Sequence, residues 1–210
     1  KHDLNRLWDE EGIANLKNGD LNNEDVKQQA ELFDNINDII KTDRGPLYFM
    51  DLHSTSSETI PFLTVNDTLL NRKFTSLFPV PMILGIEEYL DGPMLSYINE
   101  LGYVAFGYEG GQHDNIEAIE NHVSFIYLSL VFAGCIAKED IDFEHHYQLL
   151  QKRTSEAKGV YEIYFRYEIK SNEKFVMKPG YKNFQFIPKG NQLATSDGNV
   201  INALSDGRVF

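Results

Sequence analysis

The most informative segment of the sequence is Tyr48-Phe-Met-Asp-Leu-His-Ser-Thr-Ser-Ser-Glu-Thr-Ile-Pro61. It begins as a short apolar run after Gly45-Pro46, which is typical of a buried strand, and it breaks into hydroxylated residues directly after His53. In an open α/β sheet, ligands bind beyond the carboxyl ends of the strands. The stretch therefore predicts a strand that ends at a functional edge, although a lone histidine in this place is more often structural than a metal ligand.

Helical patterns flank this strand on both sides. Apolar residues recur at three- and four-residue spacing over 22–41, 66–77, 92–102 and 114–136. Two further apolar runs, 82–84 and 103–108, lie between these segments and are interpreted as strands. Strands that alternate with helices indicate an α/β fold in which helices flank a mostly parallel sheet.

The pattern changes after about residue 157. Apolar and polar residues alternate over 161–170, which predicts a strand, and turn signals such as Lys178-Pro-Gly180 and Asp197-Gly-Asn199 then separate short strand-like pieces. The sequence therefore predicts two domains: an α/β domain over 1–157 and a small all-β domain over 158–210.

Composition and charge exclude some classes of partner. The net charge of −13 argues against a nucleic-acid-binding protein, because that affinity depends on Lys and Arg that neutralise phosphates. No apolar run is long enough to cross a membrane, so we expect no membrane partner. The single cysteine, Cys135, forms no intrachain disulfide, which fits a reducing, cytoplasmic location.

Polar residues follow two of the predicted strands: Asp51-Leu52-His53, and Glu109-Gly110-Gly111-Gln112-His113. A glutamate followed by two glycines can approach a substrate without a bulky neighbour, and beside a zinc-bound water it can act as a general base. The structural alternative is a Glu109 that forms a salt bridge at the sheet edge, with glycines that only make the turn. The local sequence leaves both interpretations open.

Four motifs in order resemble the succinylglutamate desuccinylase/aspartoacylase family, which belongs to the zinc carboxypeptidase-like hydrolases. They are Asp3-Leu4-Asn5-Arg6, Asp51-Leu52-His53-Ser54-Thr55, Tyr108-Glu109-Gly110-Gly111-Gln112-His113 and Phe175-Val-Met-Lys-Pro-Gly-Tyr-Lys-Asn-Phe184. The resemblance implies a zinc carboxypeptidase-like catalytic domain over 1–157 and an incomplete β domain over 158–210. Because the chain opens at Lys1 and stops at Phe210 within a strand-like stretch, we expect a protein truncated at both ends.

Carried over to this sequence, the resemblance implies a zinc ligand at His53 and a general base at Glu109. It also implies that Asn5 and Arg6 bind a carboxylate of the substrate, and we expect Ser54 and Thr55 to line the same pocket. The family takes two further zinc ligands from a His-x-x-Glu motif that precedes the Asp-Leu-Asn-Arg stretch. Either that segment exists upstream of residue 1, or this is a metal-free relative.

The leading hypothesis is a Zn²⁺-dependent hydrolase of an amide bond in a small N-acyl amino acid or short peptide with a free carboxylate. Residues 94–108 contain no second arginine, so a substrate with a single free carboxylate is expected. The alternative is a non-catalytic, metal-free binding protein on the same scaffold. The β domain either covers one rim of the pocket or builds a homo-oligomer.

Two other histidines carry different expectations. His113 ends the motif that begins at Tyr108, so it either touches the site or only precedes the next helix. His122 falls on the long helical pattern and is expected to be a core or boundary residue.

Overall fold

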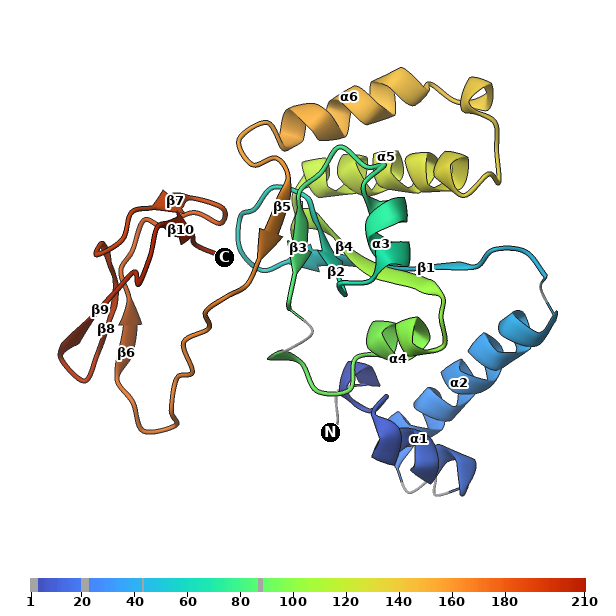
Figure 1. The fold of residues 1–210 in the computed structure, drawn as a ribbon, viewed down its shortest axis with the longest axis horizontal. Helices are drawn as coiled ribbons and strands as arrows, with labels where there is room; N and C mark the ends of the chain where they lie inside the picture. The colour runs from blue at the N-terminus through green and yellow to red at the C-terminus, as the bar shows by residue number, and fades with distance from the viewer. Residues whose placement is uncertain (1–3, 20–22, 43, 87–88) are drawn as a thin grey trace.

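The computed structural model describes residues 4–19, 23–42, 44–86 and 89–210, and its central feature is a five-stranded sheet (Figure 1). Its strands are β1 (Tyr48–Thr55), β4 (Val104–Gln112), β2 (Phe62–Val65), β3 (Met82–Leu84) and β5 (Val160–Glu162), in that spatial order. The pairs β1–β4, β2–β3 and β3–β5 are parallel, whereas β2 and β4 are antiparallel. A mostly parallel α/β sheet flanked by helices is therefore confirmed.

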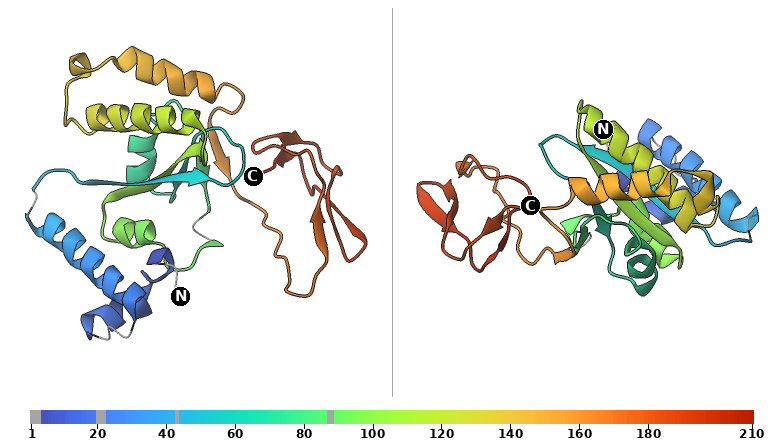
Figure 2. Two further views of the ribbon diagram at one scale, coloured as in Figure 1. Left: turned by 180° about the vertical axis from the view of Figure 1, so that it is seen from behind. Right: turned by 90° about the horizontal axis from the view of Figure 1, so that it is seen from above.

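Helices cover both faces of this sheet. On one face lie α5 (Ile116–Phe132) and α6 (Phe143–Arg153), which pack against each other, and on the other lie α1 (Glu10–Lys17), α2 (Glu24–Thr42) and α4 (Met94–Glu100) (Figures 1 and 2). The remaining helices are α3 (Leu69–Thr75) and the short 3₁₀ turns η1 (Leu4–Arg6) and η3 (Lys138–Asp140). Polar side chains cap several helix starts, since Asp9, Thr68, Asn115 and Asp142 each accept a backbone N–H of the first turn.

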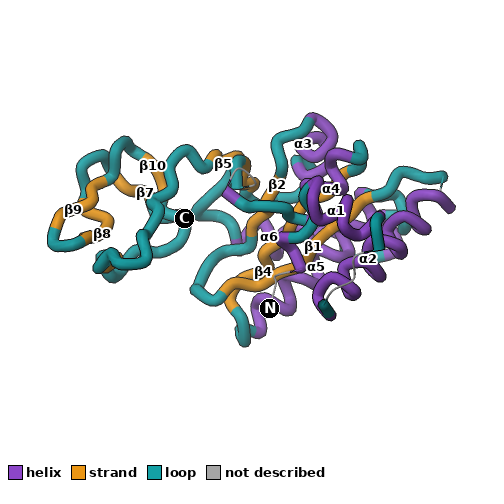
Figure 3. Tube along the Cα trace, turned by 90° about the horizontal axis from the view of Figure 1, so that it is seen from below, coloured by secondary structure: helices purple, strands orange, loops and turns teal. Residues whose placement is uncertain are grey.

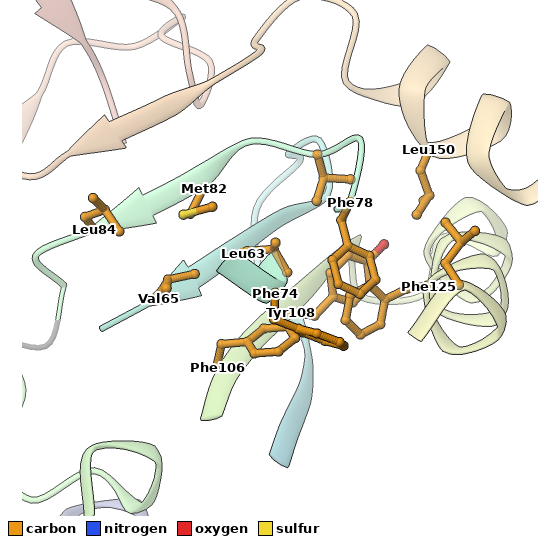
Figure 4. Packing of buried hydrophobic residues seen from close by; sticks show 12 residues of the cluster. Leu63, Val65, Phe74, Phe78, Met82, Leu84, Phe106, Tyr108, Phe125 and Leu150 are labelled. Atoms are coloured by element: carbon orange, nitrogen blue, oxygen red, sulfur yellow. The ribbon is translucent and has the colours of Figure 1, made fainter. Parts of the chain in front are cut away.

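The alternation of side chains along β4 divides the core into two clusters. Phe106 and Tyr108 point toward α5, where Tyr108 stacks on Phe125 with ring centroids 3.9 Å apart (Figure 4). Ala105, one residue out of phase, packs instead with Ile98 of α4 and the α1–α2 layer. Both faces of the first half of the strand are thus buried, which explains the continuous apolar sequence of residues 104–108.

The segment after β5 forms two small antiparallel sheets beside the central one (Figure 3). One contains β6 (Phe175–Met177), β8 (Gln192–Ser196) and β9 (Asn199–Asn202), and the other pairs β7 (Phe186–Ile187) with β10 (Gly207–Arg208). We call residues 163–210 the C-terminal segment. Because β5 pairs with β3, the central sheet includes a strand from beyond residue 158.

The strand expected over 161–170 is wrong for most of its length. Regular strand structure ends at Glu162, although the Ile163 N–H still donates to the Leu84 carbonyl of β3 at 3.0 Å, and residues 164–170 are exposed. The period-2 pattern is present, but beyond Ile163 no strand pairing occurs within the described residues.

Candidate functional site

The site is built on two neighbouring parallel strands. His53 of β1 and Glu109 of β4 stand directly opposite each other in the register, and Glu109 also faces Phe62 of β2. Neither residue terminates its strand, because β1 continues to Thr55 and β4 to Gln112. The expectation that β4 ends before Glu109 is therefore wrong, but the two predicted residues do come together.

Glu109 is a partly buried carboxylate with unused hydrogen-bonding capacity. Its Oε2 is buried and has no hydrogen-bond partner among the described residues. Burial raises the pKa of Glu109 above its ordinary value; His53 opposes this shift, whereas the Asp51 carboxylate adds to it. A buried carboxylate with a raised pKa and a free acceptor atom is typical of an acid–base group.

His53 is held by a carboxylate on its own strand. Its Nε2 lies 2.9 Å from Oδ2 of Asp51, two residues earlier on the same face of β1, and its side chain is half exposed. Metal-ligating histidines commonly have such a carboxylate partner. No group of three His, Cys, Asp or Glu side chains able to hold a metal ion occurs in the part of the chain that the structure describes. The described residues therefore do not complete a zinc site.

Short polar contacts tie the ends of the two strands together. Oγ of Ser54 lies 2.7 Å from Nδ1 of His113, whose backbone N–H donates to the Thr55 carbonyl at 2.8 Å. The Thr55 hydroxyl donates to the Ser57 carbonyl at 2.7 Å. These contacts hold the ends of β1 and β4 together next to His53 and Glu109. Of Ser54 and Thr55, which were both expected to line the pocket, only Thr55 lines the cavity beside Glu109.

A cavity of about 640 Å³ opens beside Glu109. The loop between β1 and β2, with Thr55, forms one wall, and the turn at 178–183 of the C-terminal segment forms another. Nδ2 of Asn183 donates to Oγ1 of Thr59 at 2.8 Å, which ties the turn to the loop. We refer to this space as the Glu109 cavity.

Asn5 and Arg6 lie elsewhere in the described structure. Oδ1 of Asn5 accepts the N–H of Met94 at 2.9 Å, at the start of α4, and Nη1 of Arg6 donates to the Asn5 carbonyl at 2.7 Å. Among the described residues that line the Glu109 cavity, neither is present. Asp3, the first residue of their motif, lies outside the described residues.

His122 is the residue of this region that the sequence did not reveal. From α5 its Nδ1 faces the Ala118 carbonyl at 2.7 Å, and its Nε2 faces the His53 carbonyl at 3.0 Å. A Cβ on Gly110 would lie 2.1 Å from Cε1 of His122, so only glycine leaves room for this ring. In the sequence, the only indication of this contact was the glycine that follows Glu109, which did not show which side chain packs against it.

Comparison with known proteins gives structural relatives only. No family model and no curated protein matches the chain. A succinylglutamate desuccinylase/aspartoacylase from Rhodobacter sphaeroides matches with a TM-score of 0.59 and 17% identity over 100% of this chain and 62% of its own. A succinylglutamate desuccinylase from Vibrio parahaemolyticus matches with a TM-score of 0.61 and 15% identity over 98% and 59%.

The product-bound ectoine utilization protein EutE (DoeB) from Ruegeria pomeroyi also matches, with a TM-score of 0.52 and 15% identity over 77% of this chain and 51% of its own. The chain therefore spans about half to three fifths of the length of these three proteins. At this identity the likeness establishes the fold. The chain has the zinc carboxypeptidase-like fold of the succinylglutamate desuccinylase/aspartoacylase structures, the family that its motifs resemble.

Proposed function

We propose that the protein is a zinc-dependent hydrolase of an amide bond in a small N-acyl amino acid or short peptide with a free carboxylate. The observation that carries this proposal is Glu109, a carboxylate with a raised pKa and an unpartnered oxygen beside a cavity and opposite His53. The fold shared with desuccinylases and an aspartoacylase supports the same class of reaction.

Glu109 is the proposed general base. A base works best when its pKa lies near the working pH, and burial moves the pKa of Glu109 in that direction. Its free oxygen would accept a proton from the attacking water and then deliver it to the departing amine. No neighbouring donor among the described residues competes for that oxygen.

His53, with Asp51 as its carboxylate partner, is the residue of this chain that we propose as a zinc ligand. The other ligands would have to come from outside the described residues, because these contain no set of three. Bound zinc would supply a Lewis acid for the scissile carbonyl and a water of lowered pKa. Asn5 and Arg6 stay the proposed carboxylate-binding pair, since a guanidinium suits a carboxylate well.

One observation favours a second candidate, a metal-free binding protein with the same cavity. Only one histidine and its carboxylate partner stand at the proposed metal position in the described part of the chain. In that case Glu109 would hold a ligand rather than move a proton.

Metal content and turnover of the Glu109→Gln variant separate these candidates. We expect elemental analysis to find about one zinc per chain, and His53→Ala to lose it. Glu109→Gln should keep the zinc while kcat falls by about 10² to 10⁴. Glu58→Gln is the matched control, because Glu58 lines the same cavity and should have little effect on kcat.

Full activity of Glu109→Gln would remove Glu109 from the mechanism. Absence of zinc after reconstitution of the protein, together with ligand binding that survives His53→Ala, would favour the binding protein.

A further inference from the structure

A second cavity of about 780 Å³ lies between β5 and the C-terminal segment, and its wall is mainly apolar. Pockets for small organic ligands typically enclose about 300–1,000 Å³ and are lined chiefly by apolar and aromatic side chains. The residues that give this wall its character are Phe165, Tyr167, Phe175, Phe186, Leu193 and Leu204. We refer to it as the aromatic cavity.

Three polar groups on this wall are already engaged by the protein, and the Glu162 carboxylate also lines it. Nη1 of Arg166 donates to the Tyr89 carbonyl at 3.0 Å, and Nη1 of Arg208 donates to the Phe184 carbonyl. The hydroxyl of Tyr164 bonds to Ser205 at 2.6 Å. What the wall offers a ligand is therefore mainly apolar contact.

The aromatic cavity adjoins the Glu109 cavity. Ile86, Met177, Val209 and Phe210 line both spaces, so these apolar side chains form a shared boundary. No charged side chain stands among these four boundary residues. The shared boundary places the aromatic cavity directly beside the proposed reaction centre.

We propose that the aromatic cavity receives the acyl chain of the substrate, so that the enzyme acts on N-acyl amino acids with a medium or long hydrocarbon chain. This inference rests on the proposed function and names its substrate class. The amide lies beside Glu109, and the chain passes the shared boundary toward Phe165 and Phe186. Burial of the chain against this wall supplies the binding energy that a short acyl group lacks.

The test compares N-acetylalanine, N-hexanoylalanine and N-decanoylalanine as substrates of the complete, metal-loaded protein. Burial of each methylene predicts that kcat/KM rises by up to about fourfold per added carbon until the cavity is filled. A profile that is flat or falls with chain length, while N-acetylalanine is hydrolysed, overturns the inference and leaves the proposed function standing.

The Leu204→Glu variant tests whether the dependence of kcat/KM on chain length arises in the aromatic cavity. Leu204 is 62% exposed and lines only the aromatic cavity, so a carboxylate there should lower kcat/KM for N-decanoylalanine by about tenfold or more. N-acetylalanine should be unaffected. Val200→Glu is the matched control, because Val200 is 56% exposed and lies outside both cavities. Equal effects of the two variants on N-decanoylalanine would overturn the inference.

Calorimetric titration with N-decanoylalanine separates failure of the inference from failure of the proposed function. If no N-acyl amino acid is hydrolysed, binding that weakens in Leu204→Glu still supports the cavity as an acyl-chain site. No binding overturns it. In that outcome, self-association measured by light scattering and lost in Leu204→Glu would show a second copy as the occupant.

Discussion

The central sheet and the C-terminal segment differ in how far they bury large apolar side chains. Tyr108 and Phe125 are fully buried and stacked between β4 and α5, whereas Tyr164 and Phe186 are 61% and 54% exposed. Both regions show apolar residues at regular spacing in the sequence. Periodicity therefore predicts burial only where a second layer of structure covers the apolar face, as α5 and α6 cover the central sheet (Figure 1).

Truncation of one phenylalanine in each region should give the largest difference in the free energy of unfolding. Phe125→Ala removes a fully buried ring that contacts Phe78, Phe106 and Tyr108, and should lower the free energy of unfolding by about 3–5 kcal/mol. Phe186→Ala removes a ring that is more than half exposed, and should cost about 1 kcal/mol or less. Urea unfolding of both variants measures the two values.

A loss of unfolding free energy for Phe186→Ala as large as that for Phe125→Ala would contradict the difference in burial between the two regions. It would mean that the ring of Phe186 is covered in solution, by a ligand or by further protein. Repeating the Phe186→Ala measurement with N-decanoylalanine present distinguishes these two explanations, since only a bound acyl chain makes the cost depend on ligand concentration.

The same contrast explains which parts of the fold the sequence could predict. The strands around Met82 and Tyr108 were found because they are apolar and lie between helical patterns. The alternation over 161–170 predicts a strand because it marks a backbone that could pair, but it does not supply a partner strand beyond Ile163. The end of β4 was misplaced because glycines interrupt a side-chain pattern without interrupting a hydrogen-bonded ladder.

The candidate site was predictable to a similar extent. His53 and Glu109 are chemically distinctive residues at the ends of two predicted strands, so the sequence suggests one site for both, and the structure has them opposite each other in the register of β1 and β4. The helical pattern predicts a core or boundary position for His122, which is partly buried in the structure, but it does not show which backbone carbonyl the ring meets. Its contact with His53 joins residues 69 apart and depends on the packing of α5 on β1 and β4.

Replacement of Gly110 by alanine tests that packing and carries the next largest expected effect. An added Cβ would overlap the ring of His122, and overpacking of this kind costs about 1–3 kcal/mol of unfolding free energy. The ring would have to leave the His53 carbonyl. In the double variant Gly110→Ala/His122→Ala the overlap is absent, so thermodynamic coupling between the two positions should be clear in urea unfolding. If the two single changes in unfolding free energy simply add, Gly110 is needed only for its backbone conformation and not to leave room for the ring of His122.

The smallest expected effects concern the pH dependence of stability. One titratable group in each region should lose its contribution to stability, and the two pH ranges should differ. His146 of α6 stacks on Tyr127 with ring centroids 4.8 Å apart, and its Nδ1 lies 3.1 Å from the Ser124 hydroxyl. Burial lowers the pKa of His146, and His145 acts in the same direction. The unfolded chain therefore binds this proton more readily. The contribution of His146 is complete above its ordinary pKa of about 6.5 and decreases as pH falls below that value.

In the C-terminal segment the corresponding group is Glu173. Hydrogen bonds from Ser196 and then Tyr167 lower the pKa of Glu173, so its contribution is present above the ordinary glutamate pKa and is lost only as pH falls below that value. Both side chains are only partly buried, so solvent screens their interactions and each slope is small. His146→Gln should flatten thermal stability between pH 5 and 7, whereas Glu173→Gln should act only near pH 4 and below. If His146→Gln also changes thermal stability near pH 4, or Glu173→Gln between pH 5 and 7, the replaced group is not the one whose titration sets that range.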